Sequence, residues 1–165
     1  HTELPEDVLA GFAQAAAGLD PTASVAAVVD AVRDHLDYEP GVTQATTLAS
    51  EAWAEGKGVC QDFVHATLGG LRHLGIPARY VSGYLMPDAD ATIGQPVTSE
   101  SHAWVEWFDG EGWVPVDPTN DRPVSLAHIA VARGRDYEDV APFKGVYLGD
   151  QDADLTVTVM ITRLS

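Results

Sequence analysis

The hydrophobic positions in the first part of the chain recur with the 3.6-residue period of α-helices. The pattern predicts a helix over residues 5–18 and a second that begins after Asp20 and continues up to Pro40. Asp20 is a good N-cap because its side chain can accept a backbone N–H, and a proline follows at the first helical position. We predict a short third helix over residues 47–55 and a fourth that starts at Cys60.

From residue 78 onward the pattern changes to short runs rich in Val, Tyr and Trp, which are typical of β-strands. Asp109-Gly110-Glu111-Gly112 is a strong hairpin signal between two of these runs. The predicted strands are residues 79–85, His102–Phe108, Trp113–Asp117 and 155–161, with a long polar loop over Met86–Ser101 and a brief helix over Ser125–Ala132. Because the helices come first and the strands follow, we predict a single α+β domain over residues 1–165.

The composition narrows the class of partner. Of 165 residues, 25 are acidic and 9 basic, which gives a net charge of −16 and a pI near 4.4. Nucleic acids and anionic membrane surfaces are therefore excluded as expected partners, since both require a basic patch. No apolar run reaches the roughly 18 residues needed to cross a bilayer, and the polar start, His1–Asp7, argues against a retained signal peptide. The lone cysteine leaves no internal disulfide, so we expect a cytoplasmic protein.

Cys60 is the only cysteine, so packing, metal binding or reactivity must explain it. Gly56, Lys57 and Gly58 precede it, and apolar residues at helical spacing follow it as far as Gly75. Cys60 would then lie in the first turn of a buried helix, where unpaired backbone N–H groups and the helix dipole favour a thiolate. This position makes a reactive cysteine as reasonable as a buried hydrophobic one.

A cysteine nucleophile needs a base, and the base needs a group that orients it. His102 opens a strand, and Asp117 ends the partner strand across the Asp109–Gly112 turn. Residues paired across a turn centred near 110 have numbers that sum to about 220, so these two side chains should be neighbours at the open end of the hairpin. The other histidines lie elsewhere: His65 and His73 point away from the start of their helix, His1 and His35 belong to a terminus and a helix end, and His128 lies in a late, peripheral segment.

Asp62 lies two residues after Cys60, where a carboxylate favours the helix start but opposes a thiolate. We expect it to point away from the sulfur and to cap backbone groups or meet Arg79. Trp104 would share a strand face with His102, where it could shield the imidazole, line an acyl pocket or simply fill the core. Tyr84 would form part of the cleft wall or brace it.

With these residues in view, the chain resembles the transglutaminase-like superfamily of papain-type fold, and it looks closest to the bacterial branch of candidate cysteine proteases. The matching segments are GVCQDF (58–63), LRHLGIPARYVSGYL (71–85), SHAWVEWF (101–108), GWVPVDPTN (112–120) and GRDYEDVAPFKG (134–145). The resemblance implies a papain-like core with Cys60 as nucleophile, His102 as general base and acid, and Asp117 as the orienting carboxylate. It also implies acyl transfer from an amide through a thioester.

Tyr38 and Gln44 could supply a side-chain donor to an oxyanion hole beside the Cys60 backbone N–H, and the resemblance favours Tyr38. The bacterial relatives often carry an N-terminal β-rich domain and the animal enzymes carry calcium sites, neither of which the sequence shows. Asp88 and Asp90 lack the ligand density of a calcium loop. The Met86–Ser101 loop is expected to act as a lid that selects substrates.

The leading hypothesis is hydrolysis of a peptide, protein or small amide, without a cofactor or metal. The same three residues would also serve transglutamination, in which an amine replaces water as the acyl acceptor. A catalytically silent interaction module is a second class of function. A zinc site formed by Cys60, His102 and Asp117 is a third, although the spacing does not match a structural zinc site.

Overall fold

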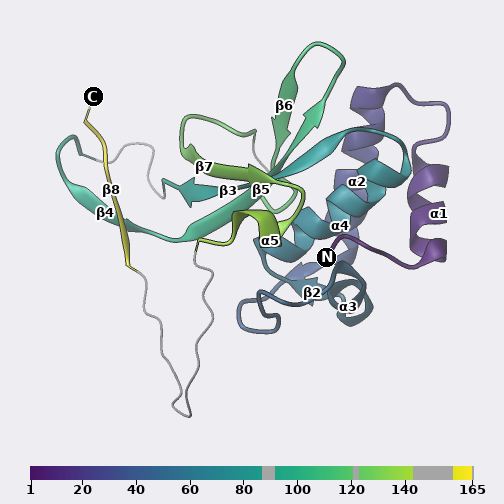
Figure 1. The fold of residues 1–165 in the computed structure, drawn as a ribbon, viewed down its shortest axis with the longest axis horizontal. Helices are drawn as coiled ribbons and strands as arrows, with labels where there is room; N and C mark the ends of the chain where they lie inside the picture. The colour runs from purple at the N-terminus through teal and green to yellow at the C-terminus, as the bar shows by residue number, and fades with distance from the viewer. Residues whose placement is uncertain (87–91, 121–122, 143–157, 165) are drawn as a thin grey trace.

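Four helices from the first half of the chain pack against a sheet from the second half (Figure 1). The computed structural model describes residues 1–86, 92–120, 123–142 and 158–164. The helices of the first half are α1 (Glu6–Ala15), α2 (Pro21–His35), α3 (Ala49–Glu55) and α4 (Cys60–His73). All four helices were predicted, although α2 ends at His35, before the predicted end at Pro40. The Asp20 side chain accepts the Ala23 N–H at 2.9 Å, as an N-cap should.

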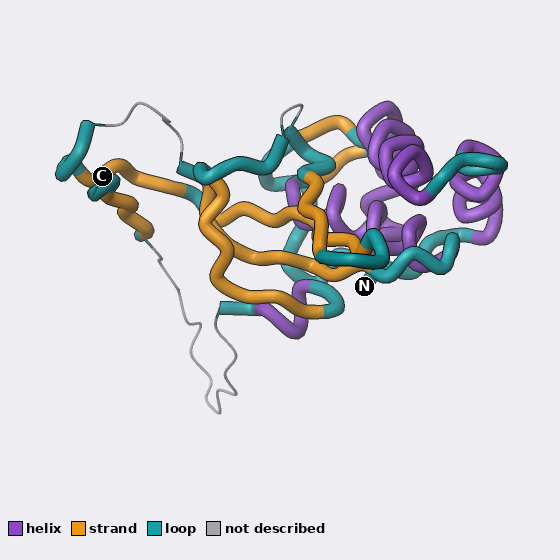
Figure 2. The backbone as a smooth tube through the Cα atoms, turned by 90° about the horizontal axis from the view of Figure 1, so that it is seen from above, coloured by secondary structure: helices purple, strands orange, loops and turns teal. Residues whose placement is uncertain are grey.

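The centre of the hydrophobic core is α4. It contacts the other three helices of the first half as well as the sheet, and all of its residues from Asp62 to Leu71 are buried. Its apolar side chains Phe63, Val64, Leu68 and Leu71 pack into the same cluster as Val28 and Val32 of α2 and Tyr80 and Val105 of the sheet. The start of α4 is thereby fixed relative to the sheet. Figure 2 shows the helices gathered at one end of the strands.

The main sheet has four strands in the order β6-β5-β3-β7, and every neighbouring pair is antiparallel. The strands are β3 (Ala78–Leu85), β5 (Ser101–Phe108), β6 (Trp113–Val116) and β7 (His128–Gly134). The predicted strands over 79–85, 102–108 and 113–117 are therefore confirmed to within a residue or two. The brief helix predicted over 125–132 is wrong, because that segment supplies the edge strand β7.

The pairing of β3 with β7 contains an irregularity beside Gly83. A Cβ atom at Gly83 would lie 2.1 Å from the Ile129 carbonyl oxygen and 2.8 Å from the Trp104 ring, so only glycine fits there. The register shifts between Ser82 and Gly83, as expected for a β-bulge. This local shift sets how the start of β7 meets the rest of the sheet.

The described residues also form two smaller sheets of two strands each. β1 (Asp37–Tyr38) and β2 (Lys57–Gly58) pair in parallel, and β4 (Pro96–Ser99) pairs antiparallel with β8 (Val159–Thr162) in an arm that projects from the body (Figure 1). The loop predicted over Met86–Ser101 thus contains a strand. Its tip, including Asp88 and Asp90, and residues 155–157 of the predicted last strand lie outside the described residues. The sequence did not predict the short helix α5 (Tyr137–Val140).

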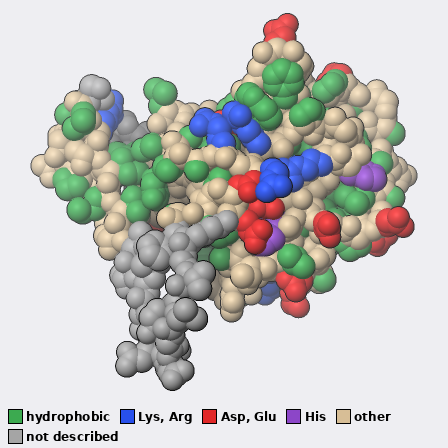
Figure 3. All heavy atoms as spheres, viewed as in Figure 1, with side chains coloured by type: hydrophobic (Ala, Val, Ile, Leu, Met, Phe, Trp, Pro, Cys, Tyr) green, Lys and Arg blue, Asp and Glu red, His purple; other side chains and the backbone are tan. Residues whose placement is uncertain are grey.

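Basic side chains gather beside acidic ones near the centre of one face (Figure 3). Arg79 and Arg133 both bind the Glu106 carboxylate, with Nε–Oε2 distances of 2.7 Å and 2.9 Å, and the Arg79 guanidinium lies 3.9 Å from the centre of the Trp113 ring. These pairs connect β3, β7, β5 and β6. Arg79 is therefore engaged with Glu106, and the expectation that it could meet Asp62 is wrong.

Among the helices of the described segments, none has the length and apolarity that crossing a membrane requires.

Candidate active site

Cys60 lies at the first position of α4, and the segment before it explains how it is held. Helix α3 ends at Gly56, whose φ of 68° is the left-handed conformation that favours glycine. Lys57 and Gly58 then form β2, paired with β1. Val59 is extended and serves as the N-cap residue of α4. The half-buried Cys60 side chain packs against the hydrophobic core, at the helix end where backbone N–H groups are available to an anion.

Asp62 caps this helix start. Its Oδ2 accepts the Val59 N–H at 2.8 Å and the Thr43 hydroxyl at 2.6 Å, and its side chain is fully buried. A Cβ atom at Gly58 would lie 2.6 Å from Asp62, which explains the glycine at that position. Burial raises the pKa of the Asp62 carboxyl, and the two hydrogen bonds only partly oppose that rise. The expected capping role is confirmed.

His102 and Asp117 meet as the hairpin predicts. His102 is near the start of β5, and Asp117 follows the last residue of β6. The His102 Nε2 lies 2.8 Å from the Asp117 Oδ2, with side chains that are 10% and 0% exposed. Because Nε2 is engaged with the carboxylate, Nδ1 is the ring nitrogen left for the Cys60 thiol.

The charges of these three groups are coupled. Burial would lower the pKa of His102, but a hydrogen bond to Asp117, a hydrogen bond to Cys60 and the charges of both partners raise it from 6.5 to about 9. Burial likewise opposes the ionised form of Asp117, yet the hydrogen bond and charge of His102 hold its pKa well below the ordinary range. The geometry therefore favours a charged imidazolium between a carboxylate and a sulfur at neutral pH.

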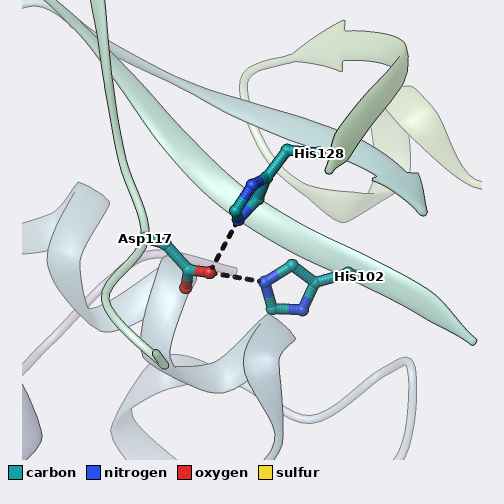
Figure 4. Close-up of side chains that lie close together, drawn as sticks. All are labelled: His102, Asp117 and His128. Carbon is teal, nitrogen blue, oxygen red and sulfur yellow. Dashed lines mark hydrogen bonds and ion pairs between the residues drawn. The ribbon is translucent and has the colours of Figure 1, made fainter. Parts of the chain in front are cut away.

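The Asp117 carboxylate accepts five hydrogen bonds (Figure 4 shows two of them). Its Oδ1 accepts the backbone N–H groups of Thr119 and Asn120 at 2.9 Å and 3.2 Å. Its Oδ2 faces His102, the Asn120 side-chain nitrogen at 2.8 Å and the His128 Nε2 at 3.2 Å. The sequence reasoning missed Asn120 and His128. The Asp-Pro-Thr-Asn segment could have signalled Asn120, because Asp commonly accepts backbone N–H groups two and three residues on.

The predicted peripheral position of His128 is wrong. Its side chain is 1% exposed and its Nε2 contacts Asp117. The alanine-rich segment around it resembles a helix locally, and only the long-range pairing with β3 makes it a strand.

Tyr38 lines a cavity of about 510 Å³ together with His102, Glu100, Thr98 and Asn120. The β1–β2 register places Tyr38 beside Gly58, two residues before Cys60. Partial burial, the nearby Cys60 and then Glu100 raise the pKa of the Tyr38 hydroxyl, so it stays protonated and able to donate. The other donor candidate, Gln44, is exposed and lines a different cavity beside Thr47.

Trp104 and Tyr84 do not line the cavity beside His102. Trp104 is 2% exposed and lies 6.1 Å from the His102 ring centre, nearly parallel to it, so it shields the imidazole and leaves the expected acyl-pocket role without support. Tyr84 lines a separate cavity of about 270 Å³ with Tyr137.

The three residues considered as zinc ligands, Cys60, His102 and Asp117, do not form a cluster of ligand atoms in the structure. Within the described ranges, the group of ligand-type side chains that cluster is His102, Asp117 and His128, whose ligand atoms lie within 4.8 Å of one another, and Cys60 is not among them.

Comparison with known families and structures agrees with this geometry. The family model of the transglutaminase-like superfamily matches residues 11–118. A candidate cysteine protease from Cytophaga hutchinsonii has the same fold, with a TM-score of 0.68 and 26% identity over 96% of this chain and 47% of that one. This confirms the predicted α+β, papain-like fold class.

Several curated proteins are related in sequence. An uncharacterized protein of Mycobacterium leprae is 49% identical over 88% of this chain, and one of Mycobacterium tuberculosis H37Rv is 39% identical over 74%. A protein-glutamine gamma-glutamyltransferase of Pseudomonas aeruginosa is 35% identical over 49%. The chain spans 52%, 41% and 13% of their respective lengths.

Proposed function

Because the chain belongs to the transglutaminase-like superfamily, we propose that it transfers acyl groups from amides through a thioester on Cys60, with water as the principal acceptor. The observation that carries this proposal is the position of His102, whose Nε2 lies 2.8 Å from the Asp117 Oδ2 and whose pKa is raised by both Asp117 and Cys60. A buried carboxylate, an imidazole and a thiol at a helix start form the arrangement that activates a cysteine nucleophile.

The chemistry follows from these positions. The Cys60 thiolate attacks the amide carbonyl carbon, and the carbonyl oxygen takes up the negative charge, with the Cys60 backbone N–H and the Tyr38 hydroxyl as the proposed donors to it. The His102 imidazolium gives its proton to the departing amine, and the C–N bond breaks to leave a thioester. His102, now neutral, takes a proton from water, which attacks the thioester; the C–S bond breaks, the acid is released, and the Cys60 thiolate and the His102 imidazolium are restored.

A second candidate is transfer to an amine, and Glu100 favours it. Its side chain is exposed in the cavity beside His102, close enough to Tyr38 to influence that hydroxyl. A carboxylate at the cavity, on a chain of net charge −16, would attract a cationic amine acceptor. The Pseudomonas relative is named for a reaction of this type. Water and amine would then compete for the same thioester.

Intact-mass spectrometry after incubation with peptide and amide libraries tests the proposal. We expect a covalent acyl adduct on Cys60, none in Cys60→Ala, and a labelled amine in the product only if the transferase candidate holds. If Cys60 forms no adduct with any substrate and reacts with iodoacetamide at pH 7 only as fast as free cysteine does, the chain is a catalytically silent module and the proposal fails.

A further inference from the structure

We infer that His128 is a positioning residue, which acts through Asp117 by donating an N–H to the carboxylate oxygen that also binds His102. The inference rests on the proposed function, since it assigns a role in the chemistry of that same site. Its basis is the pair of imidazoles that approach one oxygen from two different strands, β5 and β7 (Figure 4).

The direction of the His128 hydrogen bond follows from its second ring nitrogen. The Ser125 backbone N–H points at the His128 Nδ1 at 3.1 Å, and an N–H can only donate. Nδ1 therefore accepts, so the ring proton is on Nε2, which lies 3.2 Å from the Asp117 Oδ2. His128 is in this way held as a donor to Asp117.

The same bond argues against a metal at this cluster, although the three ligand atoms lie within 4.8 Å of one another. A metal on the His128 Nε2 would move the ring proton to Nδ1, where it would face the Ser125 N–H. Histidine ligands instead donate their second N–H to an acceptor. The Ser125 backbone thus assigns the cluster to hydrogen bonding.

The surroundings hold both rings in place. The Trp104 ring lies 5.3 Å from the His128 ring centre in an edge-on contact and 6.1 Å from that of His102 in a nearly parallel one. The His128 side chain is only 1% exposed, so water does not replace its N–H at Asp117. The charge of Oδ2 is shared between two imidazole N–H groups and Asn120.

This sharing has a chemical consequence. A carboxylate that accepts a hydrogen bond from His128 as well stabilises the His102 imidazolium less than a carboxylate that is bound to His102 alone. His128 therefore keeps His102 acidic enough to protonate the departing amine and basic enough to take the proton back from water.

Two substitutions separate this role from simple packing. His128→Phe fills the site without an N–H, whereas the amide of His128→Gln can still donate to Asp117. For His128→Phe we expect the His102 titration midpoint, followed by NMR, to rise by about half a unit to one unit, and kcat to fall about tenfold with KM little changed. His128→Gln should restore most of both values. His73→Phe, at an exposed position of α4, is the control and should match the wild type.

An unchanged His102 midpoint in a folded His128→Phe protein, or equal kcat values for the Phe and Gln variants, would overturn the inference. If His128→Phe does not fold, the long-range ¹H–¹⁵N spectrum of the wild type decides instead: a proton on the His128 Nε2 at pH 7 supports the inference, and one on Nδ1 contradicts it. Neither NMR measurement needs a substrate. A His102 midpoint that responds to His128 in a protein that forms no acyl adduct would therefore refute the proposed function and leave the coupling standing.

Discussion

Two buried carboxyl groups lie beside Cys60 and His102, and their pKa values are shifted in opposite directions. Asp62, beside Cys60, accepts hydrogen bonds from a backbone N–H and a hydroxyl, and its pKa is raised. Asp117, beside His102, accepts five hydrogen bonds, one of them from an imidazole that becomes charged, and its pKa is lowered. Neutral donors alone do not offset the cost of burying a charge, whereas a cationic partner does.

The difference assigns each carboxylate a task. Asp62 caps the first turn of α4 and needs no charge for that purpose. Asp117 is useful to His102 only as an anion, and the Thr119 and Asn120 backbone helps to keep it one. The site thus holds one carboxyl group that stabilises the start of α4 and one that supplies a negative charge to His102.

Among these substitutions, Asp117→Asn should have the largest effect. The His102 midpoint should fall from about 9 toward its ordinary 6.5, because the largest contribution that raises it is removed, and kcat/KM should fall about a thousandfold. Steady-state kinetics and NMR titration measure both effects. Asp62→Asn, the matched buried carboxylate, should change the His102 midpoint little. Equal effects of the two substitutions would contradict the separate tasks.

The shifted pKa values of His102 and Asp117 predict how the stability of the fold depends on pH. The folded chain binds the His102 proton more tightly than the unfolded chain, so this contribution is complete below pH 6.5 and is lost as the pH rises through about 9. The lowered pKa of Asp117 acts in the opposite direction: its contribution is present above the ordinary carboxyl pKa and disappears as the pH falls through the folded value. The free energy of unfolding, measured in urea across this pH range, should rise with pH in the acidic part and fall with pH in the basic part. Both changes should be smaller in Asp117→Asn.

Tyr38→Phe tests the proposed oxyanion donor at the Cys60 end of the site. Loss of one such donor should lower kcat by about a hundredfold while KM changes little. Tyr84→Phe is the matched control, because Tyr84 lines a different cavity. A wild-type kcat in Tyr38→Phe would remove Tyr38 from the mechanism and leave the backbone N–H of Cys60 as the donor.

Asp62→Ala measures how much the capping of α4 by Asp62 contributes to stability. It removes both hydrogen bonds at the start of α4 and should reduce the free energy of unfolding by about 2 kcal/mol. Asp62→Asn keeps an acceptor oxygen and removes the cost of a buried charge, so at pH 7 it should be at least as stable as the wild type. Because the pKa of Asp62 is raised by folding, its contribution to stability begins to fall as the pH rises above the ordinary carboxyl pKa, and the loss is complete once the pH exceeds the raised value. A strongly destabilised Asp62→Asn in urea unfolding would show that the charge itself is needed.

Glu100→Gln should have the smallest effect. If amines are acceptors, the rate with a cationic amine should fall about three- to tenfold and lose its salt dependence, while the rate of hydrolysis stays constant. Glu111→Gln, in the turn at the far end of the β5–β6 hairpin, is the control. A salt-independent wild-type rate would show that Glu100 does not attract the acceptor.

Much of the fold followed from local patterns, and so did the meeting of His102 and Asp117. The β5–β6 hairpin has a strong turn signal at Asp109–Gly112, and its register brings these two residues together without reference to the rest of the chain. Helix α4 is marked by its apolar period and by the glycines before Cys60. These features depend on neighbours in sequence, so the sequence could reveal them.

His128 could not be found in this way. Its strand is alanine-rich, lies at the edge of the sheet and pairs with β3 through a bulge at Gly83, about 45 residues earlier in the sequence. Its contact with Asp117 depends on that pairing and on the Ser125 N–H. The role of Trp104 could not be chosen from the sequence for a similar reason, because its ring is covered in part by His128 of β7.

The proposed mechanism requires that Cys60 helps Asp117 to stabilise the His102 imidazolium. NMR titration of His102 in the wild type and in Cys60→Ala tests this claim most directly. We predict a wild-type midpoint near 9 that falls in Cys60→Ala, because the Cys60 sulfur is one of the groups that raise the pKa of His102. The same midpoint in both proteins, or one near 6.5 in the wild type, would contradict it.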